Sequence, residues 1–293
     1  MLPVLGKPMV ERIAEELWQE GIRDLILVIR PDDQEISEHF LNNSIFRGEV
    51  HFIIQEKSQG MAKALNLAAP SIKKDFIMSA CDNLVPAGQI QAMISQWKRH
   101  SDLAGILTLM KLDPAEITST GIVGLDGDRV TRIVEKPALS EAPSDIGSLP
   151  LYLFSQDILK YLSQVAPSPR GEYELQDAIQ MLIDHGGQIL GMYVPWRLTI
   201  TSPEDLRQIN LHYLAEGAND LIRLPADLPD QIQIQPPVFI EDGVMVGAGG
   251  KIGPGVYLEK GCTLGRGVQI RDSVVLRSGR VFDGESVDGR III

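Results

Sequence analysis

Cysteine, basic side chains and long apolar runs are all scarce in this chain of 293 residues. Two cysteines, Cys81 and Cys262, cannot build a disulfide framework, so a reducing compartment is expected. The 27 Lys and Arg residues face 39 Asp and Glu residues, and the net charge of −12 gives no electrostatic drive toward nucleic acid or an anionic membrane. No apolar run is long enough to cross a membrane, and the first residues carry no signal pattern. We therefore expect a soluble cytoplasmic protein with no nucleic-acid or membrane partner.

The first two-thirds of the chain alternate short apolar runs with helical patterns. Strands are expected at 24–29, 50–54, 76–80, 103–108 and 189–194, and helices at 8–20, 59–69, 89–100 and 174–185. The turn Asp126-Gly127-Asp128 between two apolar runs predicts a hairpin. This alternation predicts an α/β fold with a Rossmann-like, mostly parallel sheet that is covered on both faces.

The C-terminal part has a period of six residues. Its aliphatic positions are Ile240, Val246, Ile252, Leu258, Leu264, Ile270, Leu276 and Phe282. Such hexads build a short left-handed parallel β-helix with the aliphatic side chains inside, whereas the turns of a β-sandwich would not keep a fixed period. We expect an α/β domain at 1–224, a linker at 225–237 and the β-helix at 238–293. A stack this short needs capping, which favours a homo-oligomer.

Short motifs recur in order along the first domain. They are Leu2-Pro3-Val4, Lys7-Pro8-Met9, Gln55, Gln59-Gly60-Met61-Ala62, Cys81-Asp82-Asn83, Gly121-Ile122-Val123, Glu135-Lys136-Pro137 and Gly171-Glu172-Tyr173-Glu174-Leu175. Each is weak alone, but their order and spacing, followed by hexads, are specific. The chain resembles the sugar-1-phosphate nucleotidylyltransferases, or NDP-sugar pyrophosphorylases, over nearly its whole length. The resemblance implies transfer of a nucleotidyl group from a nucleoside triphosphate to a sugar 1-phosphate, with glucose 1-phosphate as the default, giving an NDP-sugar and pyrophosphate.

The resemblance also assigns the nucleotide side of the site. Gln55, Gln59 and Gly60 would bind the nucleotide, and Asp82 would bind the nucleotide, act in catalysis and hold Mg²⁺. A carboxylate at the end of a strand suits a hard metal ion, and glycine allows the backbone to approach a base closely. Taken alone, Asp82-Asn83 is more typical of a turn after a strand, and Gln59-Gly60 of the start of a helix.

On the sugar side, the resemblance implies that Gly121, Glu135, Lys136 and Glu174 bind the sugar. Lys136 would also be catalytic, because it would hold the sugar phosphate. Taken alone, Glu135-Lys136 before a proline could equally be a solvated ion pair.

Two departures from the family pattern keep an alternative open. The family's first strand, its glycine-rich loop and a catalytic lysine would all lie before Met1. Within the chain, Leu198 aligns with a metal-binding aspartate, and leucine cannot ligate Mg²⁺; Cys81 stands in place of a glycine. The alternative is a catalytically silent sugar-nucleotide-binding or regulatory subunit. An acyltransferase ranks last, because residues 236–293 contain no histidine.

Overall fold

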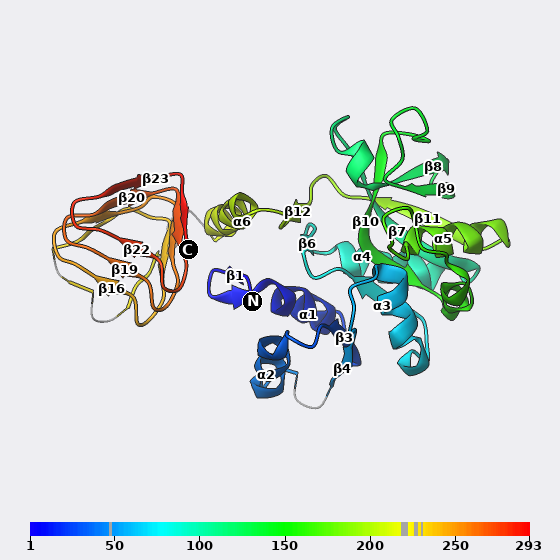
Figure 1. Ribbon diagram of the computed structural model, residues 1–293, viewed down its shortest axis with the longest axis horizontal. Coiled ribbons are helices and arrows are strands. Elements are labelled where there is room, and N and C mark those ends of the chain that lie inside the picture. The colour runs from blue at the N-terminus through cyan, green and yellow to red at the C-terminus, as the bar shows by residue number, and fades with distance from the viewer. Residues whose placement is uncertain (47–48, 218–221, 226–227, 230) are drawn as a thin grey trace. The chain divides into compact units, whose positions relative to one another are not determined.

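The computed structural model describes residues 1–46, 49–217, 222–225, 228–229 and 231–293. The chain divides into two compact units, one formed by Met1–Arg12 with Leu198–Ile293 and the other by Ile13–Arg197. Figure 1 shows both, and each is described by itself.

The α-helices match the expected ranges, and α2 and α6 are additional. Their bounds are α1 Met9–Gln19, α2 Gln34–Asn42, α3 Met61–Ala68, α4 Gln89–Arg99, α5 Leu175–Asp184 and α6 Pro203–Glu216. In the described part of the chain, no helix is both long enough and apolar enough to cross a membrane.

The unit Ile13–Arg197 is built on a six-stranded sheet of order β5-β10-β7-β11-β9-β8. The strands are β5 Phe76–Ser79, β7 Leu103–Lys111, β8 Gly121–Asp126, β9 Arg129–Glu135, β10 Ile146–Phe154 and β11 Gln188–Tyr193. Strand β11 runs parallel to β7, and the other pairings are antiparallel. The α/β class is confirmed, but the expectation of a mostly parallel sheet is wrong. Hairpin β8–β9 and strand β10 supply the antiparallel pairings, and the sequence pattern did not identify β10 as a strand.

Strand β10 was missed because Pro150 interrupts its apolar run. Pro150 lies where the register against β7 shifts between Leu149 and Tyr152. Proline lacks the N–H that a regular ladder needs, and a bulge tolerates this loss.

Two further strands form a separate parallel pair. Strand β3 (Leu25–Ile29) pairs with β4 (Val50–Ile54) in the register Leu25↔Val50. Gln55, directly after β4, donates its backbone N–H to the carbonyl of Ile29 at 2.8 Å.

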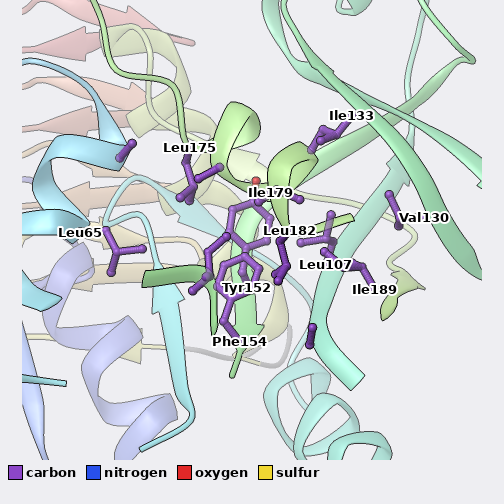
Figure 2. Close-up of a cluster of buried hydrophobic side chains, with 14 of the residues drawn as sticks. Leu65, Leu107, Val130, Ile133, Tyr152, Phe154, Leu175, Ile179, Leu182 and Ile189 are labelled. Carbon is purple, nitrogen blue, oxygen red and sulfur yellow. The ribbon is translucent and has the colours of Figure 1, made fainter. Parts of the chain in front are cut away.

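Each face of the six-stranded sheet packs against its own hydrophobic core, and successive side chains of a strand enter the two cores in turn. Leu107 and Leu109 of β7 contribute to the core under α5, which Figure 2 shows around Tyr152 and Phe154. Ile106 points the other way, into a second core that includes Met93 of α4. The short strand β6 (Asn83–Leu84) lies just before α4 in sequence.

The unit Met1–Arg12 with Leu198–Ile293 contains three parallel sheets in the C-terminal region. Their orders are β13-β15-β18-β21-β24, β14-β17-β20-β23 and β16-β19-β22, and Figure 1 shows β16, β19 and β22 stacked in that order. The strands are β13 Ile222–Arg223, β14 Gln233–Ile234, β15 Val238–Ile240, β16 Met245–Val246, β17 Lys251–Ile252, β18 Val256–Leu258, β19 Thr263–Leu264, β20 Gln269–Arg271, β21 Ser273–Val275, β22 Arg280–Val281, β23 Ser286–Asp288 and β24 Ile291–Ile292.

The period of six holds only in the first half of this stack. Ile240 pairs with Leu258 at a spacing of 18 residues, whereas Leu258 pairs with Val275 at a spacing of 17. The shortening falls where Asp272 has a φ of 46°, in the left-handed region. Val281 therefore occupies the buried position and Phe282 is 72% exposed, against the expectation from the hexads.

Helix α6 and the N-terminal segment belong with these strands. Strands β1 (Pro3–Val4) and β2 (Lys7–Pro8) form a small antiparallel pair, and β12 is Leu198–Thr199. Asn210 of α6 is fully buried and hydrogen-bonds the backbone of Pro3 and Leu5, while Arg207 donates to the carbonyl of Asp272 at 2.7 Å. In this structure α6 belongs to the unit that contains Leu198–Ile293, and the expected domain boundary at 224 stays a prediction. The expected linker 225–237 includes 226–227 and 230, outside the described residues, and it contains β14 (Gln233–Ile234).

Candidate functional site

The hairpin β8–β9 and strand β10 meet at Gly121. Gly121 pairs with Glu135 of β9 and with Ser148 of β10, so the ends of three strands lie side by side. Lys136 follows β9 with a φ of 43°, and its backbone N–H donates to the carbonyl of Thr120. The β-pairing thus brings together three residues that the sequence predicted for the sugar, namely Gly121, Glu135 and Lys136.

Glu174, the fourth predicted sugar residue, joins this group from the start of α5. It is 5% exposed and accepts hydrogen bonds from Ser168 and Arg170, both at 2.8 Å. The Arg170 guanidinium also lies 3.9 Å from Glu135 Oε1, and Lys136 Nζ lies 3.8 Å from the same oxygen. We call Gly121, Glu135, Lys136, Arg170, Glu174 and Gln176 the Glu135 cluster.

The Glu135 cluster holds two nearly buried carboxylates and two cations whose side chains are 36% and 42% exposed. Burial raises the pKa of Glu135 to about 7, and the neighbouring Glu174 carboxylate adds to this rise, while Lys136 and Arg170 oppose it. Near neutral pH, Glu135 is therefore present in both its protonated and its ionised form. Positive charge or hydrogen-bond donors from a ligand would favour the ionised form.

The absent side chain of Gly121 allows Glu135 and Gln176 to lie close against the backbone of β8. A Cβ built there would lie 2.9 Å from Glu135 Oε2 and 3.0 Å from Gln176 Nε2. Glu135 Oε2 and Gln176 Oε1 are both buried, and neither has a hydrogen-bond partner among the described residues. Unpaired buried polar atoms are uncommon in folded proteins, so these two oxygens indicate a binding site for a polar ligand beside Gly121.

Gln59 and Gly60 are attached to the same region through Tyr173. Gly60 has a φ of 95°, and a Cβ there would lie 2.5 Å from the carbonyl oxygen of Tyr173. Tyr173 N–H donates to the carbonyl of Gln59 at 2.8 Å, and Ala62 N–H donates to the carbonyl of Tyr173 at 3.1 Å. The predicted nucleotide motif therefore lies directly beside the residue that precedes Glu174, and glycine is required for this close approach.

Asp82 lies in an exposed turn after β5, which we call the Asp82 turn (Cys81–Asn83). Ala80, just before it, donates to the carbonyl of Pro150 in β10, so the turn and Gly121 flank the same short stretch of β10. The surrounding chain partly desolvates the Cys81 thiol although the residue is exposed at the surface, and this desolvation together with the Asp82 carboxylate raises the pKa of the thiol. Gln55 lies apart, after β4; its side-chain Nε2 is buried without a partner among the described residues.

The atoms around Asp82 show whether this turn could bind Mg²⁺. Asn83 Nδ2 donates to Asp82 Oδ1 at 3.3 Å, and Asn83 Oδ1 is buried and unpartnered within the described chain. Carboxylate and amide oxygens are ligands that suit Mg²⁺, which commonly uses one or two carboxylates together with substrate phosphates. In the described part of the chain, no group of three or more His, Cys, Asp or Glu side chains could hold a metal by itself. The residues fit an open site completed by phosphate, not a closed one.

Sequence reasoning missed Arg170 and Gln176. Arg170 precedes a recognised motif, and nothing local indicates that it reaches Glu135 as well as Glu174. Gln176 left a detectable signal, because it is a polar residue next to Leu175 on a helix whose neighbours Ile179 and Leu182 are buried; it is itself 3% exposed.

Residues 1–197 match the family model for nucleotidyl transferases, and the chain belongs to this family. The uridylyltransferase AglF of Haloferax volcanii, which acts on UTP and glucose 1-phosphate by its name, is 30% identical over 207 residues; the match covers 70% of this chain and 83% of AglF. The nucleotidyltransferase Agl11 of the same organism, named for low-salt glycan biosynthesis, is 29% identical over 214 residues and 72% of this chain. This chain spans only 58% of Agl11.

Among solved structures, a UDP-glucose pyrophosphorylase complexed with UDP-glucose is similar with a TM-score of 0.67. The match covers 74% of this chain and 90% of that protein, at 19% identity. At this identity the likeness shows the fold alone.

Proposed function

We propose that this chain transfers a nucleotidyl group from a nucleoside triphosphate to a sugar 1-phosphate, with glucose 1-phosphate as the first substrate to try. The observation that carries the proposal is the Glu135 cluster, in which Glu135 and Gln176 each keep one buried oxygen unpartnered and the cations of Lys136 and Arg170 lie 3.8 and 3.9 Å from Glu135. The family and the names of its relatives, AglF above all, support the same reaction.

The reaction asks the site to bring two anions together. A phosphate oxygen of the sugar 1-phosphate attacks the α-phosphorus of the triphosphate, forming a new P–O bond, while the bond to the β-phosphate oxygen breaks and pyrophosphate leaves. Lys136 neutralises the sugar phosphate, and Glu135 and Glu174 accept hydrogen bonds from sugar hydroxyls. Gln55, Gln59 and Gly60 bind the base. Positioned charge of this kind is the main source of catalysis in such transfers.

Asp82, together with the side-chain amide oxygen Oδ1 of Asn83, would hold Mg²⁺. The ion supplies positive charge to the phosphate oxygens when it is bound. The position of Asp82 at the end of β5, beside the stretch of β10 that carries Ser148, supports this assignment.

A pyrophosphate-release assay tests the proposal. The protein is incubated with glucose 1-phosphate and each of the five common nucleoside triphosphates in turn, with Mg²⁺ and with excess chelator. We expect Mg²⁺-dependent release that requires the sugar phosphate. Absence of release with every triphosphate would overturn the proposal.

Leu198 favours one second candidate, a catalytically silent sugar-nucleotide-binding subunit. Leucine at this position of β12 offers no oxygen to a metal ion. If the chain is such a subunit, nucleotide sugars should raise its melting temperature and no pyrophosphate should be released. Release in the assay above would exclude it.

We further propose that the three C-terminal parallel sheets form a left-handed β-helix of hexapeptide repeats through which the chain self-associates. The in-register pairing of β15, β18, β21 and β24 supports the stack, and the exposed Phe282 and Ile293 support an apolar contact with a second copy. Light scattering of the purified chain should give a mass of a dimer or larger; a monomer at micromolar concentration would contradict this.

A further inference from the structure

We propose that Gln176 is a specificity residue of the sugar pocket, and that its carboxamide and the Glu135 carboxylate together bind one hydroxyl of the sugar over Gly121. This inference rests on the proposed function, and it adds a requirement that the proposed function does not contain: a free hydroxyl at one defined ring position.

The first observation is the state of the Gln176 side chain. Gln176 lies in the first turn of α5 and is 3% exposed, and its Oε1 has no partner among the described residues. Gln180, one turn further along α5, shows the contrast. Its Oε1 accepts from the Ile133 N–H and its Nε2 donates to Asp184, both at 2.8 Å. The helix therefore carries one carboxamide that is satisfied by the protein and one that is not.

The second observation is what Gln176 faces. Its Nε2 and the Glu135 Oε2 lie 3.0 Å and 2.9 Å from the same point, the position that a Cβ of Gly121 would take. Glu135 Oε2 makes no hydrogen bond to Gln176 or to any other described residue. Both polar groups therefore lie against Gly121, close enough to each other for one ligand hydroxyl to reach both, and a side chain at this position would collide with them.

The chemistry of the two groups defines that third group. A carboxylate oxygen accepts a hydrogen bond, and a carboxamide N–H donates one. A hydroxyl can donate to Glu135 Oε2 and accept from Gln176 Nε2 at the same time, whereas a methylene or an apolar substituent would leave both unpaired. The remaining Gln176 Oε1 can accept from a neighbouring hydroxyl of the same ring. The pocket should therefore reject a sugar that is deoxygenated at this position.

Calorimetric binding tests this without turnover. UDP-glucose and dTDP-glucose, with their 2-, 3-, 4- and 6-deoxy analogues, are titrated into wild type, Gln176→Met and Gln180→Met. We expect wild type to bind one deoxy analogue about 10- to 100-fold more weakly than the parent. Gln176→Met should lose affinity for the parent by a similar factor and lose discrimination at that position only. Gln180→Met should keep the wild-type pattern, although it removes two structural hydrogen bonds.

The outcomes separate this inference from the proposed function. An unchanged pattern in Gln176→Met, or failure of wild type to bind any member of the panel, overturns the inference. Loss of discrimination in Gln176→Met supports it even if the pyrophosphate-release assay is negative, a result that would overturn the proposed function alone.

Discussion

The Glu135 cluster and the Asp82 turn flank the same part of β10, yet they are built differently. The two carboxylates of the cluster are nearly buried, its residues come from β8, β9, α5 and the segments next to them, and charged contacts connect Arg170 and Lys136 to the two glutamates. The Asp82 turn is exposed, and its one side-chain contact within the described residues is the bond between Asn83 and Asp82.

This difference indicates which part of the site is shaped by the protein alone and which part is shaped by its ligands. The Glu135 cluster has its geometry fixed by strand pairing and burial, so its selectivity should survive without other ligands. The Asp82 turn offers oxygens but little surrounding support, so its geometry should depend on the metal and phosphate that bind there. Changes at the turn should therefore affect turnover, and changes in the cluster should affect binding, stability and pH dependence as well.

The largest expected effect is at the Asp82 turn. Asp82→Asn removes the carboxylate proposed for Mg²⁺, and we expect turnover to fall by about 1,000-fold with little change in melting temperature. Pyrophosphate release at several Mg²⁺ concentrations measures this. Asp126→Asn, in the exposed turn of the β8–β9 hairpin, is the matched control. Wild-type turnover in Asp82→Asn would remove the metal role from this turn.

Lys136→Gln should lower turnover by about 100-fold, because it removes the cation proposed for the sugar phosphate. It also removes a charge that opposes the high pKa of Glu135. Steady-state kinetics with varied glucose 1-phosphate measures the change, and Lys111→Gln, an exposed lysine at the end of β7, serves as control. Equal effects of the two substitutions would contradict the proposed role.

Gly60→Ala should lower the free energy of unfolding by about 3 kcal/mol, because a Cβ there meets the Tyr173 backbone in addition to the strain of a positive φ. Gly88→Ala is the control, since Gly88 has a φ of 87° and open space around its missing Cβ. It should cost only about 1 kcal/mol. Denaturant unfolding compares the two, and equal losses would show that the contact with Tyr173 does not matter.

Glu135→Gln should change the pH dependence of stability. In wild type the pKa of Glu135 is raised from 4.5 to about 7, so the folded state holds this proton more tightly than the unfolded state. Stability then falls as the pH rises from about 4.5 to about 7, by about 3 kcal/mol. Denaturant unfolding at pH 5 and pH 8 should show this loss in wild type and in Glu141→Gln, an exposed control.

Glu135→Gln should lack most of the pH-dependent loss. An identical fall in the free energy of unfolding in wild type and Glu135→Gln would mean that Glu135 does not titrate in this range.

Local patterns predicted much of the fold. Continuous apolar runs and helical spacing identified β7, α4 and α5, the Asp126-Gly127-Asp128 turn identified the β8–β9 hairpin, and the hexads identified the C-terminal stack. They did not predict strand order, because the pairing of Gly121 with both Glu135 and Ser148 depends on contacts between distant segments.

The same limit applied to the site. Motifs identified Glu135, Lys136 and Glu174, which the structure brings together. The contact of Arg170 with two glutamates depends on tertiary packing, and no local pattern contains it. The shift from 18 to 17 residues per coil was missed because the valines at 274 and 275 fit either register; both are fully buried, and Val275 is the one that pairs with Leu258 and joins the core of the stack.

The most direct test of the account follows ¹³C-labelled glucose 1-phosphate into a nucleotide sugar by mass spectrometry, with the triphosphate that supports pyrophosphate release, in wild type and Lys136→Gln side by side. If the chain transfers a nucleotidyl group as proposed, wild type forms a labelled NDP-sugar together with an equal amount of pyrophosphate, and Lys136→Gln forms it about 100-fold more slowly. Absence of labelled product in wild type, or equal rates in the two proteins, would contradict it.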